Sequence, residues 1–336
     1  MFKKLFFTLV ICLFIKTNAQ DGTVSPYSYF GLGTFNPANT VENNAMGGLS
    51  IYGDSIHVNL QNPASYGLLK LTTYTVGVSH RRMALTSDTQ EKSTALTAID
   101  YLSVAMPIAE NIGIGFGITP VTSMGYILNS SAENANGETI TNVFSGDGGL
   151  SKIYFSLGAA PIKNFTVGAS AFANFGTVNK ERVQSLSSVL FGTIDRRTSR
   201  MNGFNFQMAA NYTPNITDKL TLYTSFVHTT GLDLKASNTQ QVGSLSLVNG
   251  SELEVSDLDL EAANLKNNTV KIPSVTTLGL GIGADKKWLL GASYTIQEMG
   301  SFSSTFLSQS NVAYSEASTL RVGGYYVPDY APFASF

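Results

Sequence analysis

Beyond residue 70 the chain alternates between short segments of period-two hydrophobicity and connectors that are long and short in strict turn. Apolar side chains recur at every second position of these segments, which is the pattern of a β-strand with one apolar face. The pattern predicts ten strands, over residues 71–80, 98–106, 112–119, 151–159, 165–175, 203–212, 220–227, 275–283, 288–297 and 319–327.

The connectors indicate what kind of sheet these strands form. Four are tight and rich in Pro, Asn, Asp or Lys, over 107–111, 161–164, 214–219 and 284–287. The long set covers 82–97, 120–150, 176–202, 228–274 and 298–318. A bacterial transmembrane β-barrel has short periplasmic turns and longer external loops, and its strands need about 9–11 residues to cross the bilayer. With the N-terminus in the periplasm, every long connector falls outside the cell. A secreted β-sandwich would also alternate, but its connectors would not sort in this way.

The segment 112–118 shows the two faces of a strand most clearly, because Ile, Ile, Phe and Ile alternate there with glycine. Segments 203–212 and 275–283 repeat the division between large apolar and small or polar positions. Glycine weakens a strand unless a close approach requires it. Two explanations remain open: the glycines leave room in the lumen for a plug or a ligand path, or they relieve crowding and permit curvature.

The composition agrees with a membrane protein that has no membrane-spanning helix. Only 13% of the 336 residues are charged, against roughly a quarter in soluble domains. No apolar run reaches the roughly 18 residues of a spanning helix. Residues 1–19 read as a signal peptide, with Lys3 and Lys4 before an apolar core that holds Cys12, the only cysteine. Removing it leaves 18 basic and 23 acidic residues, so a nucleic-acid partner is not indicated.

Residues 20–68 do not read as barrel strands, because they are dense in Gly, Asn and Pro. We expect this segment to be a plug, or hatch, in the lumen of a barrel formed by residues 69–336. It contains the runs Ala45-Met46-Gly47-Gly48 and Asn62-Pro63-Ala64, with Asp54 between them.

On these residues the chain resembles the long-chain fatty-acid transporter family of outer-membrane proteins (FadL/TodX-like), and it is similar to relatives of that family in Bacteroidetes, including PorV-like proteins. The run Ile272-Pro273-Ser274-Val275 adds to the likeness. The resemblance implies a barrel of about fourteen strands, of which about ten are visible here. Because Pro328 and Pro332 cannot lie inside a fully paired closing strand, we expect either a chain that lacks its C-terminal part or a smaller barrel.

The resemblance implies an outer-membrane channel for passive uptake of hydrophobic small molecules, fatty-acid-like or aromatic, without a cofactor. The expected ligand-lining residues are Tyr27, Tyr29, Phe30, Leu32 and Phe35, and the expected hatch motif comprises Gly47, Gly48, Asp54, Asn62, Pro63 and Ala64. Membrane lipid and lipopolysaccharide would surround the barrel in the outer membrane of a Gram-negative bacterium. The alternative is a non-transporting subunit that docks a protein partner of a secretion or outer-membrane assembly complex.

Residues that could carry other chemistry are few. His57, His80 and His228 are scattered, which indicates neither zinc binding nor a catalytic centre, and we do not expect an enzyme. The acidic run over 252–261 suits either a calcium site or a solvated, partly β-structured loop. Arg196, Arg197 and Arg200 could bind lipid phosphates or be ordinary solvated charges. Six aromatic residues near strand ends could form interfacial girdles or pack inside the protein, namely Tyr101, Tyr126, Tyr212, Trp288, Tyr325 and Tyr326.

Overall fold

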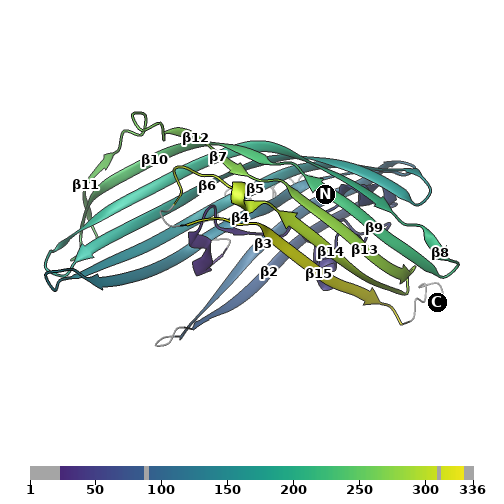
Figure 1. Ribbon diagram of the computed structural model, residues 1–336, viewed down its shortest axis with the longest axis horizontal. Helices are drawn as coiled ribbons and strands as arrows, with labels where there is room; N and C mark the ends of the chain where they lie inside the picture. The colour runs from purple at the N-terminus through teal and green to yellow at the C-terminus, as the bar shows by residue number, and fades with distance from the viewer. Residues whose placement is uncertain (1–22, 87–90, 309–311, 329–336) are drawn as a thin grey trace, which may run out of the picture.

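The computed structural model describes residues 23–86, 91–308 and 312–328, so the predicted signal peptide lies outside the described residues. Most of the described chain after residue 72 is antiparallel β-sheet (Figure 1). The strands are β1 (Thr34–Phe35), β2 (Thr73–Thr86), β3 (Glu91–Ala109), β4 (Ile112–Glu133), β5 (Thr139–Ile162), β6 (Phe165–Leu186), β7 (Phe191–Tyr212), β8 (Asn215–Thr217), β9 (Leu220–Thr229), β10 (Leu232–Ser246), β11 (Glu252–Asp257), β12 (Asn267–Ile272), β13 (Val275–Ala284), β14 (Trp288–Gln297) and β15 (Ala317–Tyr326).

These strands form one curved sheet in the order β15-β14-β13-β9-β7-β6-β5-β4-β3-β2. Neighbours in the chain are neighbours in space, as in an up-and-down barrel. Strands β2 and β15 form the two edges, and within the described residues the sheet does not close on itself. No helix in the described part of the chain is long and apolar enough to cross a membrane.

All ten predicted strands are confirmed, but the prediction of long loops between them is wrong for most of its range. Strands β4 and β5 continue as a paired hairpin to a turn at 134–138, and β6 and β7 continue to a turn at 187–190. Strands β10, β11 and β12 lie within the predicted connector 228–274. These segments are rich in Ser, Thr, Asn and Gly, and this composition led to the prediction of loops. In the structure, pairing within the sheet satisfies the hydrogen bonds of their backbone groups.

The chain is interrupted between β9 and β10 and again between β12 and β13, and the two interruptions lie opposite each other. Strand β7 pairs with β9 through residues 207–212 and with β10 through residues 191–202. Strand β12 pairs with β10, and strand β13 pairs with β9. Pro273 stands at the second break, where its missing N–H cannot continue the ladder. The sheet therefore has a lower part, which ends at the tight connectors between strands, and an upper part, which ends at the turns 134–138 and 187–190.

The lower part has the two faces of a membrane barrel. Phe204, Phe206 and Met208 on β7 are 74%, 57% and 55% exposed, whereas Asn205 and Gln207 between them are buried. The same outward apolar face continues on both sides, through Val76, Leu102, Phe116, Phe155, Phe226, Leu278, Leu290 and Leu320. A band of exposed apolar side chains around a polar interior is stable only where lipid covers it.

In the upper part this pattern is inverted. On β10 Leu232, Leu234 and Ala236 are buried, while Asp233 and Lys235 between them are exposed. Buried apolar side chains of neighbouring strands join the same inner core, among them Met124, Leu150, Val178, Met201, Val270 and Ile272. Polar groups on the outside and an apolar core inside are the pattern of a sheet in water. Because β7 has 22 residues and crossing takes about 9–11, its upper half extends beyond the bilayer.

The residues before β2 pack against the inner face of the sheet. They form the short helices η1 (Pro26–Tyr29), α2 (Val41–Ala45) and η2 (Pro63–Leu68), and β1, which adds to the upper part of β4. We call residues 23–69 the N-terminal segment. In Figure 1 this segment, in purple, lies between the front strands β13–β15 and the strands behind them.

The glycines of the strands make room for this segment. A Cβ at Gly115 would lie 2.0 Å from the Tyr66 ring, and a Cβ at Gly168 would lie 2.3 Å from the backbone of Pro63. On the opposite wall, a Cβ at Gly279 would lie 2.1 Å from Ile51. Of the two explanations open at the start, the space for a plug accounts for these glycines, since the N-terminal segment fills the space they leave.

Of the six aromatic residues for which an interfacial girdle and packing both remained open, four divide into two groups by exposure. Tyr212 and Tyr326 are 50% and 73% exposed and lie at the short-turn ends of β7 and β15, as a girdle requires. Tyr101 and Tyr126 are buried on the inner face instead, where they pack among other core residues. The interfacial reading is wrong for these two, because proximity to a strand end does not tell which face a side chain occupies.

Candidate functional site

A pocket of about 500 Å³ opens in the upper part of the sheet, above the membrane-facing band. The end of η1, strands β4 to β7 and the chain that follows η3 (Met299–Ser301) form its walls. Its lining combines aromatic, aliphatic and charged side chains, namely Tyr29, Phe30, Tyr126, Phe144, Lys180, Glu181, Arg182, Asp195, Arg197, Phe306, Leu307, Ser308 and Val312.

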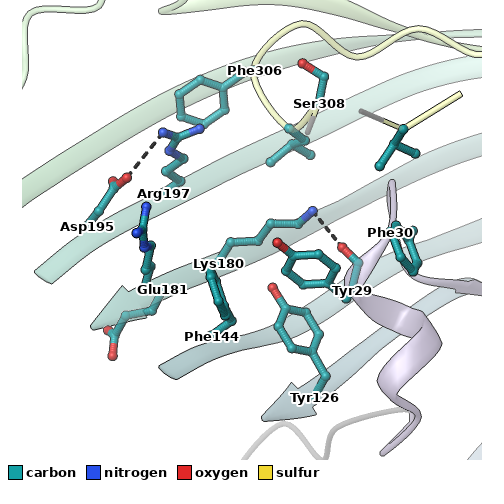
Figure 2. Close-up of a pocket in the computed structure, with 13 residues that line it drawn as sticks. Tyr29, Phe30, Tyr126, Phe144, Lys180, Glu181, Asp195, Arg197, Phe306 and Ser308 are labelled. Carbon is teal, nitrogen blue, oxygen red and sulfur yellow. Dashed lines mark hydrogen bonds and ion pairs between the residues drawn. The ribbon is translucent and has the colours of Figure 1, made fainter. Parts of the chain in front are cut away.

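Tyr29 stands at the centre of an aromatic cluster. Its ring packs edge-on against Tyr126, Phe30 and Phe144 at centroid distances of 5.2, 5.4 and 5.8 Å. Figure 2 shows Tyr29 and Phe30 reaching into the pocket from the N-terminal segment, while Tyr126 and Phe144 rise from the strands below. This side of the pocket can cover the apolar body of a small molecule.

Three cations border the aromatic cluster. Lys180 donates a hydrogen bond of 3.1 Å to the carbonyl oxygen of Tyr29, so β6 holds the end of η1. The guanidinium of Arg182 lies 5.6 Å from the centre of the Phe144 ring, and that of Arg197 lies 5.9 Å from the centre of the Phe306 ring. Arg197 also pairs with Asp195 at 3.2 Å. The pocket thus places polar and positively charged groups beside an apolar surface, which suits an amphipathic ligand.

The N-terminal segment is fixed at this place by contacts with β4. The Ser28 hydroxyl accepts a hydrogen bond from the backbone N–H of Gly125 at 3.1 Å. Gly33 has a φ of +96°, and a Cβ there would lie 2.4 Å from the carbonyl oxygen of Ser123. Thr34 then pairs with Ser123 in the short ladder between β1 and β4. A left-handed turn at glycine brings the chain close enough to β4 to add a strand.

The five residues expected to line the ligand site have different positions. Tyr29 and Phe30 line the pocket. Leu32 is 1% exposed and belongs to the apolar core of the upper part. Tyr27 and Phe35 are 81% and 40% exposed and lie outside the pocket lining. An aromatic-rich run in the sequence does not separate a ring that meets a cavity from one that meets solvent or a core.

Asn62 joins the N-terminal segment to the wall of the barrel. It is fully buried, and its Nδ2 donates to the carbonyl oxygen of Ser50 at 3.0 Å and to Oδ1 of Asn211 on β7 at 2.7 Å. Its Oδ1 accepts from the N–H of Ala64, which caps η2. Pro63 begins η2, and Ala64 is buried against Ala209 and Val227. The Asn-Pro-Ala run thus seats the N-terminal segment on the sheet.

Gly47 and Gly48 lie where the segment approaches the edge strand β15. Both have positive φ, +80° and +73°, which favours glycine. A Cβ at Gly47 would lie 2.7 Å from the carbonyl oxygen of Val322. The segment therefore touches the wall at β15 as well as at β4 and β7.

Asp54 organises a turn close to the start of β2. Its carboxylate accepts hydrogen bonds from the backbone N–H groups of Ile56 and His57, from the His57 ring and from the Tyr52 hydroxyl. Burial opposes ionisation of this carboxyl, but the hydrogen bonds from His57 and Ile56 prevail and lower the pKa of Asp54 to about 2. The hydrogen bond to Asp54 raises the pKa of His57. Tyr52 also packs on Tyr325 of β15, so this turn links the two edges of the sheet.

The two charged sets left open in the sequence are also placed. Arg196 is not an ordinary loop charge, because it lies in β7 and pairs with Glu181 and Glu252 at 2.9 and 2.8 Å. The acidic run is partly a strand, β11, as the second of its two readings expected. Glu261 pairs with Lys266, and no group of carboxylates suited to a metal ion is found in the described ranges.

Sequence reasoning missed most of the pocket, including Lys180, Arg182, Phe144 and Phe306. The sequence pattern predicts loops over residues 120–150, 176–202 and 298–318, and a predicted loop assigns no face to its side chains. The alternation of Leu232-Asp233-Leu234-Lys235 was an available signal, since it places charge where the lower strands place apolar side chains.

The family model that matches spans residues 1–336 and describes BamG. The chain belongs to the BamG family. No curated protein matches the chain.

Among solved structures, the BamG-family chain is similar to the toluene transporter TodX of Pseudomonas putida, with a TM-score of 0.56 and 15% identity over 88% of this chain and 81% of TodX. It is also similar to a FadL homologue of Pseudomonas aeruginosa, with a TM-score of 0.52 and 14% identity over 88% of this chain and 78% of that one. At this identity the likeness shows the fold, which is that of a FadL-like outer-membrane β-barrel.

Proposed function

We propose that this BamG-family protein is an outer-membrane channel through which hydrophobic small molecules with a polar or anionic end pass by diffusion. The observation that carries the proposal is the pocket around Tyr29, where aromatic rings and the cations Lys180, Arg182 and Arg197 lie side by side. It sits above the lipid-facing band, against an apolar core inside the sheet. The similarity to TodX, which is a toluene transporter, supports the same reading.

In this proposal the N-terminal segment is the hatch of the channel. A solute enters the pocket from outside the cell, and it passes further when the contacts of the segment with the wall loosen. The short turns and the N-terminus then lie in the periplasm, and outer-membrane lipid and lipopolysaccharide surround the apolar band. Passage of this kind requires no catalysis and no cofactor.

Binding of a fluorescent long-chain carboxylate to the purified, detergent-solubilised protein tests this function. Tyr29→Ala removes the central ring of the pocket, and we expect it to weaken binding by about tenfold, since a ring in contact contributes about 1.5 kcal/mol. Tyr27→Ala is the matched control, because Tyr27 is 81% exposed and lies outside the pocket. Equal affinity of the two variants for this probe and for an uncharged aromatic probe would refute the proposal.

A second function is favoured by the upper part of the sheet, which extends beyond the membrane and carries polar groups outside. We propose as the alternative that the protein is a subunit that binds a protein partner at the outer membrane, with which membership of the BamG family is compatible. Purification from native membranes separates the two functions. A partner in stoichiometric amount supports the subunit, and a lipid or fatty acid bound inside the barrel supports the channel.

A further inference from the structure

The ends of two hairpins in the upper part carry exposed apolar side chains. Leu190 and Phe191, at the turn between β6 and β7, are 67% and 53% exposed. Val248 and Leu253, around the turn between β10 and β11, are 77% and 54% exposed. We call these residues, together with Val189 and Leu247, the tip surface. They are large apolar side chains that lie outside the buried apolar core of the upper part.

The two hairpin ends form one continuous surface. The backbone N–H of Leu247 donates to the carbonyl oxygen of Leu190 at 3.0 Å. Phe191 pairs with Ser246 in the ladder between β7 and β10. Leu253 follows Glu252, which pairs with Leu245. Side chains from residues about sixty positions apart therefore share one apolar patch.

Lipid does not explain this patch. Between the tip surface and the membrane-facing band the outer face is polar, with Arg200 and Asn202 exposed on β7 and Lys235 exposed on β10. A bilayer reaching the tips would have to bury these groups, at a cost of several kcal/mol for each charge. Contiguous apolar surface in water marks a contact with another macromolecule.

The border of the patch is acidic. All six residues of β11 are exposed, and they include Glu254 and Asp257 as well as Glu252, which pairs with Arg196 of β7. Asp259 and Glu261 follow at once, and Lys266 is the one cation among residues 247–266. This charge disfavours two occupants. Lipopolysaccharide presents phosphate and acidic sugars, and a second copy of this chain would present the same acidic border, so both would be repelled.

We propose that the tip surface docks a protein outside the cell whose contact surface is apolar and bordered by lysine and arginine. The apolar patch would supply the buried centre of the contact, and β11 would supply its charged rim and the orientation of approach. This inference rests on the second function proposed above, and it places partner binding on side chains outside the solute pocket.

Site-specific photo-crosslinking in native outer membranes tests the proposal. The full chain carries p-benzoylphenylalanine at Leu190 or at Val248, with Asn136 as the matched control, since Asn136 is exposed at the neighbouring turn between β4 and β5 and lies outside the tip surface. We expect one discrete protein adduct from Leu190 and Val248 and none from Asn136. A second experiment adds Glu254→Lys, which should lower the adduct yield about tenfold at low salt, whereas Glu133→Lys on the β4–β5 hairpin should not.

Each other outcome overturns the inference. An adduct whose attached group carries sugar and is not digested by protease identifies lipopolysaccharide. An adduct of twice the mass of the chain identifies a second copy. An equal yield with Glu254→Lys and Glu133→Lys removes the charge argument. Failure of the location and failure of the function remain distinguishable: a stoichiometric partner that co-purifies but gives no adduct at the tips refutes the tip surface alone, and the absence of any partner in native membranes refutes the subunit function.

Discussion

Replacing Asn62 by alanine should loosen the N-terminal segment from the sheet. Asn62 is fully buried and connects Ser50, Ala64 and Asn211 through its side chain. Loss of the cap of η2 costs about 1 kcal/mol. Oδ1 of Asn211 would stay buried without its donor, which costs about 1–3 kcal/mol more. The sum, about 2–4 kcal/mol, corresponds to an undocked population about 30-fold to 700-fold larger.

Hydrogen exchange measured by mass spectrometry on peptides covering residues 59–69 reads this population directly. In the Asn62→Ala protein we expect their exchange to accelerate, while peptides of β5 and β6 away from the segment keep their rates. Asn136→Ala is the control, because it makes the same change at an exposed turn. The double variant Asn62→Ala, Asn211→Ala should exchange no faster than Asn62→Ala alone, since the unsatisfied carbonyl is gone. Unchanged exchange in Asn62→Ala, or strictly additive acceleration in the double variant, would refute the reasoning.

Three further predictions follow from the faces and contacts of the sheet. Leu234→Ala should destabilise the protein by about 2–5 kcal/mol in chemical unfolding, whereas Leu278→Ala, the same change on the lipid-facing side, should have a much smaller effect; equal losses would contradict the inverted faces. Gly168→Ala should displace the N-terminal segment, at about 1–3 kcal/mol, and raise single-channel conductance, whereas Gly231→Ala, with its nearest neighbour at 3.4 Å, should not. The ion pair between His57 and Asp54 should stabilise its turn most between about pH 4 and pH 6.5. It weakens as pH rises through the raised pKa of His57, and it also weakens as pH falls towards the pKa of Asp54, which is about 2. Limited proteolysis should show the protection of the turn, and in His57→Ala this protection should no longer be lost at high pH.

The strands and the faces of the lower sheet were predictable from the sequence, because both are recorded locally. Each of the ten predicted segments overlaps an observed strand, and the large apolar side chains Phe204, Phe206 and Met208 of segment 203–212 are the exposed ones. Successive side chains of a strand point to opposite faces of the sheet, so the period-two pattern shows which of them face lipid without any knowledge of the partner strands. The Asn-Pro-Ala run is also recognisable in the sequence, but its hydrogen bond to Asn211, 149 residues further along the chain, is not.

The upper sheet and the pocket were decided by tertiary structure. The Gly and Asn of residues 120–150 and 176–202 have weak strand preferences, and these strands form because each pairs with its neighbour over twenty or so residues. The pocket needs Tyr29 beside Tyr126 and Lys180, contacts that span about 100 to 150 residues. No local pattern records such a meeting. The sequence by itself thus determined which side of each ribbon faces lipid, and only the folded chain determined where the lipid ends and what the interior holds, because both depend on packing between distant segments.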